Sequence, residues 1–339
     1  MSVLRKHWFL VGLITLLPLA VLLGMADPPA WLITVTGGLP TSWCTAAILF
    51  LMSVTLDTGR LVESLKRPWP VMTAICVNQF VLPLACLPLL PLQQSADLRV
   101  GLLIAASVPC TMAAASVWTR RAGGNDAVSL LVTLTTNGLC FVMTPLWLAV
   151  GQQWFGTVSA DGSLQAGDMV VRLVTAALIP AAVGQLLRRH TGLAAKVDAN
   201  RKRCSNTAQA IILTLVFVSA FKGGLRFQAD GMASGLRHAE FAIVWGCCIG
   251  LHLWAMLAAW LLSGGLRLDE ADRRACVIAG SQKTLPIGIL VSQATGLPFS
   301  LLPMLMFHTS QLFIDTWVAD RLQRRGPIPS SPPLPPPAT

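Results

Sequence analysis

Ten apolar segments follow one another along the chain, separated by short polar stretches. They cover residues 8–26, 41–59, 69–91, 100–119, 127–149, 170–188, 207–222, 239–263, 274–294 and 299–319. A helix of about 18 or more mostly apolar residues is long enough to cross the hydrocarbon core of a bilayer. The pattern therefore predicts an all-α membrane protein with ten transmembrane helices, in one integral membrane domain over residues 1–325.

The first five segments resemble the last five, which predicts two repeats over about residues 1–150 and about residues 168–325. The fourth segment, DLRVGLLIAASVPCTM, and the ninth, DRRACVIAGSQKTLPIG, both open near an aspartate and contain a proline further on. An odd number of spans per repeat turns the second copy upside down in the membrane. Inverted repeats with interrupted helices at matching positions are a signature of secondary transporters, whose binding sites lie where the breaks meet.

Pro109 and Pro286 interrupt these two segments, and polar residues crowd around both prolines. Proline removes a helix hydrogen bond and frees carbonyl groups. In a bilayer, freed carbonyls are tolerated only where they are buried in protein or line a watery cavity. A kink at one proline is common in spanning helices, whereas two polar breaks at matching positions favour a binding site.

The composition agrees with a membrane protein, because 54% of the residues are hydrophobic and only 12% are charged. The net charge of +10 is unevenly distributed. With a cytoplasmic N-terminus, 19 Lys and Arg residues fall on the cytoplasmic side and five on the other. Positive charge accumulates on the cytoplasmic side of membrane proteins. We therefore expect an inner (plasma) membrane protein with both termini cytoplasmic, whose basic patches face the lipid bilayer and not nucleic acid.

The two ends of the chain carry further signals. The apolar run at residues 8–26 is longer than the roughly 7–15 residues of a signal-peptide core, so we interpret it as the first transmembrane helix. The C-terminal stretch GPIPSSPPLPPPAT, residues 326–339, is rich in proline and serine. Such a composition predicts a disordered tail with polyproline II character.

Three motifs resemble the bile acid:sodium symporter superfamily, and in particular its SBF-like branch. PCTMAAASVWTRRAGGN, residues 109–125, is similar to the broken fourth helix of that family and the loop after it. SQKTLPIGI, residues 281–289, resembles the ninth-helix motif, and PMLMFHTSQLF, residues 303–313, the tenth helix. The resemblance covers nearly the whole chain except the proline-rich tail.

The resemblance implies a panel domain of the first, second, sixth and seventh helices beside a core domain of the other six. In the core domain the discontinuous fourth and ninth helices would cross at their breaks. Family members typically bind two sodium ions behind that crossing. By motif position, the cation-binding residues would be Ser116, Ser129 and Thr133 at one site, and Gln79 and Gln282 at the other. Hydroxyl and amide oxygens suit a hard cation, because each replaces part of its hydration shell.

Two positions depart from the family pattern. Bile acid carriers place a glutamate four residues before Gln282, where this chain has Ile278, and an asparagine where it has Lys283. A second cation beside a buried sodium ion is costly at low dielectric. Lys283 can therefore take over the role of a sodium ion, bind an anionic substrate, or lose its proton, because burial disfavours the charged form. The coupling ion, Na⁺ or H⁺, stays open, and no other cofactor is expected.

Further polar residues around the breaks are candidates for binding the substrate. They are Thr111, Asn137, Lys283, Thr284, His308 and Gln311. His308 can equally well be a packing histidine, and Asn137 can equally well form a hydrogen bond between helices. Of the remaining polar groups, Asp57 is interpreted as an interfacial acid, Asp315 as part of a structural pair, and His252 as structural.

These features favour a secondary active transporter of a small organic anion that works by alternating access. The alternative is a membrane protein that regulates ion (calcium) homeostasis without transporting, because a eukaryotic branch of the family is linked to calcium homeostasis. A membrane-embedded enzyme is disfavoured, since the sequence has no HExxH or GxSxG motif and no paired carboxylates within a span.

Overall fold

The computed structural model describes residues 8–56, 68–112, 114–156, 166–229, 238–297 and 299–324, and all its regular elements in these ranges are helices. The prediction of an all-α protein is confirmed. Asp57 and the tail at 326–339 lie outside the described residues. The helices are α2 (Trp8–Met25), α3 (Ala30–Gly38), α4 (Thr41–Val54), α6 (Pro68–Cys76), η1 (Val77–Val81), α7 (Leu82–Cys86), η2 (Leu87–Leu92), α8 (Ala96–Ser107), α9 (Ala114–Arg121), α10 (Asp126–Phe155), α11 (Ala166–Leu173), η3 (Val174–Leu178), α12 (Ile179–Arg188), α13 (Thr191–Ala199), α14 (Arg201–Ala229), α15 (His238–Gly265), α16 (Glu270–Ser281), α17 (Leu285–Thr295) and α18 (Leu301–Arg324).

Each of the ten predicted apolar segments contains helix. Within the described ranges, six helical segments are long and apolar enough to cross a membrane, or seven if α3 and α4, bent by 54°, form one span. The pair α8 (12 residues) and α9 (8 residues) is not among them. The chain is thus a multi-pass membrane protein.

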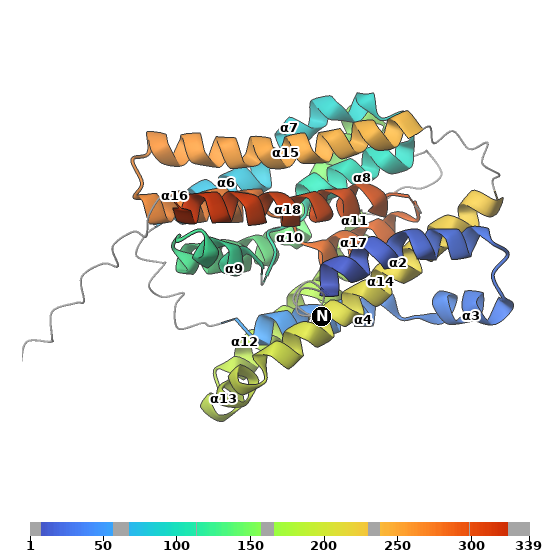
Figure 1. Ribbon diagram of the computed structural model, residues 1–339, viewed down its shortest axis with the longest axis horizontal. Helices are drawn as coiled ribbons and strands as arrows, with labels where there is room; N and C mark the ends of the chain where they lie inside the picture. Colours follow the sequence, from blue (N-terminus) through green and yellow to red (C-terminus); the bar gives the residue numbers. More distant parts are fainter. Residues whose placement is uncertain are drawn as a thin grey trace, which may run out of the picture.

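The helices form two groups that lie side by side (Figure 1). The first helix group contains α2, α4, α12 and α14, and the second contains α6 to α10 and α15 to α18. Within the first group α14 packs closely along α2. A side-chain carbon on Gly24 or Gly224 would strike the backbone of the opposite helix, so these glycines let the two backbones touch.

Asn125 begins α10 and also anchors the loop that joins this helix to α9. Its side-chain oxygen accepts a hydrogen bond from the backbone of Ala127 at 3.2 Å, which caps the helix N-terminus. Its amide nitrogen donates to Asp272 at 2.8 Å, at the start of α16. Gly123 supplies the left-handed turn before it, with φ of 69°. The GGN sequence therefore ties the α9–α10 loop to α16.

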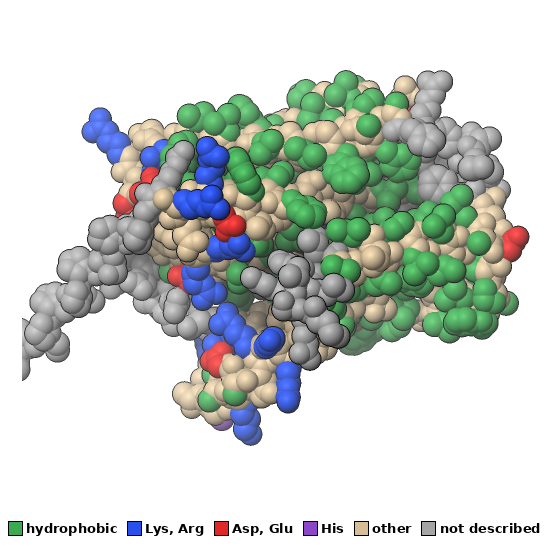
Figure 2. All heavy atoms as spheres, in the orientation of Figure 1, with side chains coloured by type: hydrophobic (Ala, Val, Ile, Leu, Met, Phe, Trp, Pro, Cys, Tyr) green, Lys and Arg blue, Asp and Glu red, His purple; other side chains and the backbone are tan. Residues whose placement is uncertain are grey.

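Charged and apolar side chains are distributed over the surface as in a membrane protein. Lys and Arg side chains gather at the end of the molecule where α9, α13 and α16 lie (Figure 2). Along α15, by contrast, Trp245, Leu253 and Leu257 are exposed. An exposed apolar flank with Lys and Arg gathered at one end is the pattern expected of helices surrounded by lipid.

Candidate functional site

The two helix breaks meet at the centre of the second helix group. Helix α8 ends at Ser107 because Val108, which precedes Pro109, takes an extended conformation with ψ of 156°. Helix α16 ends at Ser281, and the chain stays extended at Gln282 before α17 begins. The breaks touch directly, since the backbone N–H of Thr284 donates to the carbonyl oxygen of Pro109 at 2.9 Å.

Lys283 lies at this contact and its side chain is fully buried. The Nζ atom donates to the carbonyl oxygens of Asn78 at 2.6 Å and Val108 at 2.8 Å. The side-chain oxygen of Asn78 accepts a third bond at 3.3 Å. An ammonium group has three protons to donate, so these three acceptors satisfy it. Two backbone carbonyls and one side-chain amide oxygen thus hold the ammonium group.

The carbonyl of Asn78 is free because the helix there winds as a π-helix. The backbone N–H of Leu82 bonds five residues back to Val77, and not four residues back to Asn78. Pro83 has no N–H, so the carbonyl of Gln79 also lacks its usual helical donor and accepts from Trp147 Nε1 at 2.8 Å. One-turn π-helices often mark functional sites in this way.

Asn78 also connects the two residues proposed for the second cation site. Its Nδ2 atom donates to the carbonyl oxygen of Gln282 at 2.9 Å, and its Oδ1 atom accepts from Gln79 Nε2 at 3.0 Å. Gln79 and Gln282 are both buried, and Gln79 Oε1 has no hydrogen-bond partner in the described structure. The sequence interpretation missed Asn78, although an Asn-Gln pair shortly before Pro83 was a visible signal.

Asp315 is the centre of a second buried network that reaches across several helices. Its carboxylate lies 3.0 Å from His252 Nε2 and accepts from Gln282 Nε2 at 2.5 Å. His252 Nδ1 lies 3.2 Å from the carbonyl oxygen of Ser281. Asp315 therefore has a structural partner, as predicted, and that partner is His252. Gln282 also accepts from Thr111 at 2.7 Å, which extends the network to the first break.

Both ring nitrogens of His252 face oxygen atoms that accept hydrogen bonds. The carbonyl of Ser281 requires a proton on Nδ1, and a second proton must lie between Nε2 and Asp315 for that bond to form. The two contacts tie α15 to both α16 and α18.

The predicted hydroxyl ligands lie on α9 and α10, the two helices that follow the first break. Thr133 donates to the carbonyl oxygen of Thr111 at 3.1 Å. The hydroxyl of Ser129 lies 2.6 Å from that of Thr119, and Ser116 is buried on α9. The structure therefore arranges Ser129 and Thr133 along α10, beside α9 and the break.

Four of the predicted substrate residues fall into two sets. Gln311 exchanges two hydrogen bonds with the backbone of Lys283, at 3.0 and 3.1 Å, and lies 3.0 Å from His308 Nδ1. These two residues hold the second break in place. Asn137 and Thr284 are different, because each is buried with one oxygen, Oδ1 and Oγ1 respectively, that has no partner among the described residues.

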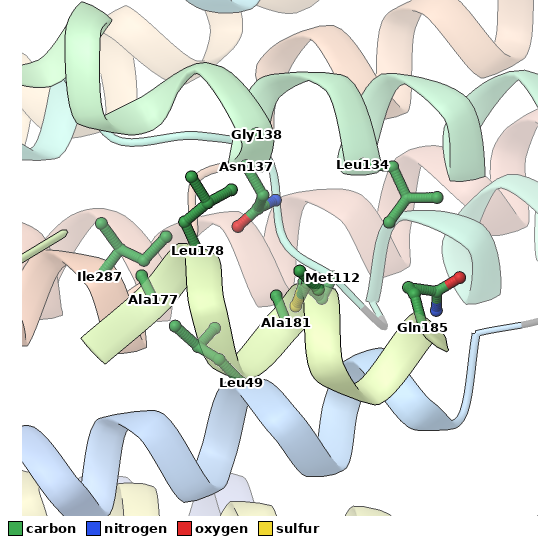
Figure 3. Close-up of a pocket in the computed structure, with 11 residues that line it drawn as sticks. Leu49, Met112, Leu134, Asn137, Gly138, Ala177, Leu178, Ala181, Gln185 and Ile287 are labelled. Atoms are coloured by element: carbon green, nitrogen blue, oxygen red, sulfur yellow. The ribbon is translucent and has the colours of Figure 1, made fainter. Parts of the chain in front are cut away.

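A cavity of about 160 Å³ lies where the two helix groups meet (Figure 3). Of the predicted substrate residues, Asn137 is the one that borders it. The lining comes from α4, the first break, α10, η3, α12 and α17 and consists of Leu49, Met112, Leu134, Asn137, Gly138, Ala177, Leu178, Ala181, Ala182, Gln185 and Ile287. Gln185, which also borders the cavity, was not among the predicted site residues.

A multi-pass membrane protein whose two broken helices meet at a buried polar centre has the features of a secondary transporter. The chain belongs to the SBF-like CPA transporter family, whose family model matches residues 7–324. This agrees with the resemblance of its motifs to the bile acid:sodium symporter superfamily. A family of transporters is also consistent with the lack of enzyme motifs in the sequence.

Several relatives have names that describe transport. The probable sodium/metabolite cotransporter BASS4 of Arabidopsis thaliana, a chloroplast protein, is 28% identical over 303 residues, which are 84% of this chain and 66% of the plant protein. The uncharacterized sodium-dependent transporter YocS of Bacillus subtilis is 24% identical over 267 residues, 77% of this chain and 75% of that protein. Sodium/bile acid cotransporter 7 of Danio rerio is 24% identical over 351 residues, 96% and 98% of the two chains.

Proposed function

We propose that the protein is a secondary active transporter of a small organic molecule and that it works by alternating access. The observation that carries this proposal is the contact between the two helix breaks at Thr284 and Pro109, close to a cavity between two helix groups. Discontinuous helices let backbone groups and small side chains take part in binding at mid-membrane. Relative movement of the two helix groups would then expose the cavity to each side in turn.

Ten transmembrane helices in two inverted repeats form part of this proposal. The broken helices support it, because α8 and α16 each have 12 residues before their breaks. The first helix group would be the panel domain and the second the core domain. The gathering of Lys and Arg at one end supports an inner (plasma) membrane protein with both termini cytoplasmic (Figure 2).

We further propose that transport is coupled to one sodium ion or one proton at most. The names of YocS and of the Arabidopsis and Danio relatives support sodium. Candidate oxygen ligands are present, among them the unpartnered Gln79 Oε1 and the hydroxyl of Thr133 beside the carbonyl of Thr111. However, Ile278 supplies no carboxylate, and Lys283 places a positive charge at the crossing. The ammonium group of Lys283 would stand in for one of the two sodium ions.

The purified full-length chain in proteoliposomes provides the test. Compounds that raise its melting temperature, with and without sodium, would first be selected from a panel of small metabolites, because ligands stabilise the state they bind. We expect at least one of them to accumulate inside the vesicles when a sodium or proton gradient is applied. Binding without accumulation under either gradient would refute secondary transport and favour a regulatory protein.

A further inference from the structure

The cavity between the two helix groups is apolar except for two carboxamides. Asn137 enters it from α10, in the second group, and Gln185 from α12, in the first. The other lining residues are Leu, Ile, Met, Ala and Gly, and no Lys, Arg, Asp or Glu is among them. Asn137 and Gln185 are therefore the lining residues whose side chains can hydrogen-bond to a molecule in this cavity.

The orientation of the Asn137 carboxamide is set by its partners. Its Nδ2 atom lies 2.9 Å from the carbonyl oxygen of Cys110 and 2.7 Å from that of Thr133. A carbonyl oxygen can only accept, so the amide nitrogen must face these two groups. The Oδ1 atom is left without a partner within the described structure, although the residue is only 7% exposed.

Gln185 is oriented in the same manner. Its Nε2 atom donates to the carbonyl oxygen of Ser53 on α4 at 2.5 Å, so Oε1 is the free end of this carboxamide as well. In Figure 3 the Asn137 oxygen points toward Leu178 of η3, and Gln185 lies further along α12, on the side of Leu134. Each helix group thus contributes one buried oxygen that can accept a hydrogen bond and receives none from the residues that the structure describes.

We infer that this cavity binds a small molecule that donates hydrogen bonds, an organic amine or alcohol, through Asn137 Oδ1 and Gln185 Oε1. The inference rests on the proposed transport function and names the substrate class for the cavity. A carboxylate or sulfonate would bring its own negative oxygens against these two acceptors. The ammonium group of Lys283, which the sequence suggested for an anion, is already bonded to Asn78 and Val108.

Size and shape restrict the ligand further. An apolar cavity of about 150 Å³ accommodates a molecule of benzene's size, and this cavity has about 160 Å³. The ligand should therefore have a compact apolar body with one or two N–H or O–H groups. A molecule that donates to both oxygens connects the two helix groups, so its affinity depends on their separation and falls when they move apart.

Three probes with one ring in common provide the test: benzylamine, benzyl alcohol and benzoate. Binding to the purified full-length protein would be measured by calorimetry and by the shift in melting temperature. We expect benzylamine, benzyl alcohol or both to bind, and to bind at least tenfold more tightly than benzoate. Preferential binding of benzoate, or binding of none of the three, would overturn the inference. Accumulation of any substrate in proteoliposomes tests the transport function separately.

Two variants locate the binding site. Gln185→Met and Asn137→Leu keep the side-chain size but remove the acceptor oxygen, and each should weaken binding of benzylamine, which has protons for both oxygens, at least tenfold. Ser53→Ala is the matched control, because it removes the hydroxyl bond to the Ala181 carbonyl next to Gln185 and keeps both acceptors. If Asn137→Leu fails to fold, Gln185→Met alone decides the question. Unchanged binding in Gln185→Met would overturn the inference.

Discussion

The ammonium nitrogen of Lys283 lies 2.6 Å from the backbone carbonyl oxygen of Asn78, although the two residues are 205 positions apart in the chain. Two irregularities create this contact. The break after α16 brings Lys283 into the protein interior, and the π-helix around Asn78 frees the carbonyl that receives it. A positive charge can remain at such depth because it is surrounded by fixed carbonyl dipoles.

The first prediction concerns the charge of Lys283. Lys283→Met keeps most of the stem but leaves the carbonyls of Asn78 and Val108 without their donor. We expect a folded protein with a free energy of unfolding lower by about 1–3 kcal/mol and with transport abolished. Uptake into proteoliposomes and elution as a single species in size-exclusion chromatography measure the two effects.

Lys222→Met is the matched control for this prediction, since Lys222 is exposed on α14 and has no role in the crossing. It should transport at the wild-type rate. A Lys283→Met protein that is less stable but still transports would show that the lysine is purely structural.

A second substitution at the same position tests the role of the ammonium group as a resident cation. Lys283→Asn removes the charge and supplies an amide oxygen that can ligate a cation. We expect sodium to raise the melting temperature of this variant more than that of the wild type, and uptake to depend more steeply on sodium. An identical sodium response in the two proteins would contradict the idea that Lys283 replaces an ion.

The third prediction concerns the buried pair of Asp315 and His252. Asp315→Asn leaves His252 facing an amide in place of a carboxylate. We expect the free energy of unfolding to fall by about 3–5 kcal/mol, because the substitution removes one partner of a buried pair. A double-mutant cycle with His252→Leu should give a coupling free energy above about 1 kcal/mol.

Asp320→Asn on the same helix serves as the control. Asp320 pairs with Arg121 at 2.6 Å, but both side chains are more than a third exposed. This substitution should therefore lower the free energy of unfolding by about 1 kcal/mol or less. Equal costs for the two substitutions, measured by denaturant unfolding, would refute a special role for Asp315.

The fourth prediction concerns orientation in the membrane. In a background without native cysteines, a cysteine at Ala160 should react with an impermeant maleimide added to intact cells, whereas one at Lys196 should react only after lysis. Lys196 belongs to the basic end of the molecule, which we place in the cytoplasm. The opposite labelling pattern would invert the topology and refute the repeat assignment.

The sequence predicts the helices well because their signals are local. Apolar runs of sufficient length predict the spans, and Pro109 and Pro286 predict the breaks after Ser107 and Ser281. Even the carbonyl environment of Lys283 follows from chemistry, since a buried ammonium without a nearby acid needs other acceptors.

The partners across helices could not be predicted in the same way. His252 and Asp315 are 63 residues apart, and His252 stands alone among apolar neighbours, so no spacing along either helix points to their contact. Gln185 was overlooked because a glutamine near the end of a span resembles an interfacial residue. Its importance comes from the Ser53 carbonyl, which fixes its amide nitrogen and leaves its oxygen free.

The glycine contact between α2 and α14 has a mechanical consequence. Where Gly24 and Gly224 let two backbones touch, no flexible side chain lies between the helices to absorb a displacement. We therefore expect α2 and α14 to move as one rigid unit at this contact. Across the cavity, α12 instead contributes the small side chains of Ala181 and Ala182 to a wall that faces lining residues of α10 and α17. If the two helix groups slide past each other, as the proposed alternating access requires, we expect the least resistance there, and the walls of the cavity would then form the sliding surface.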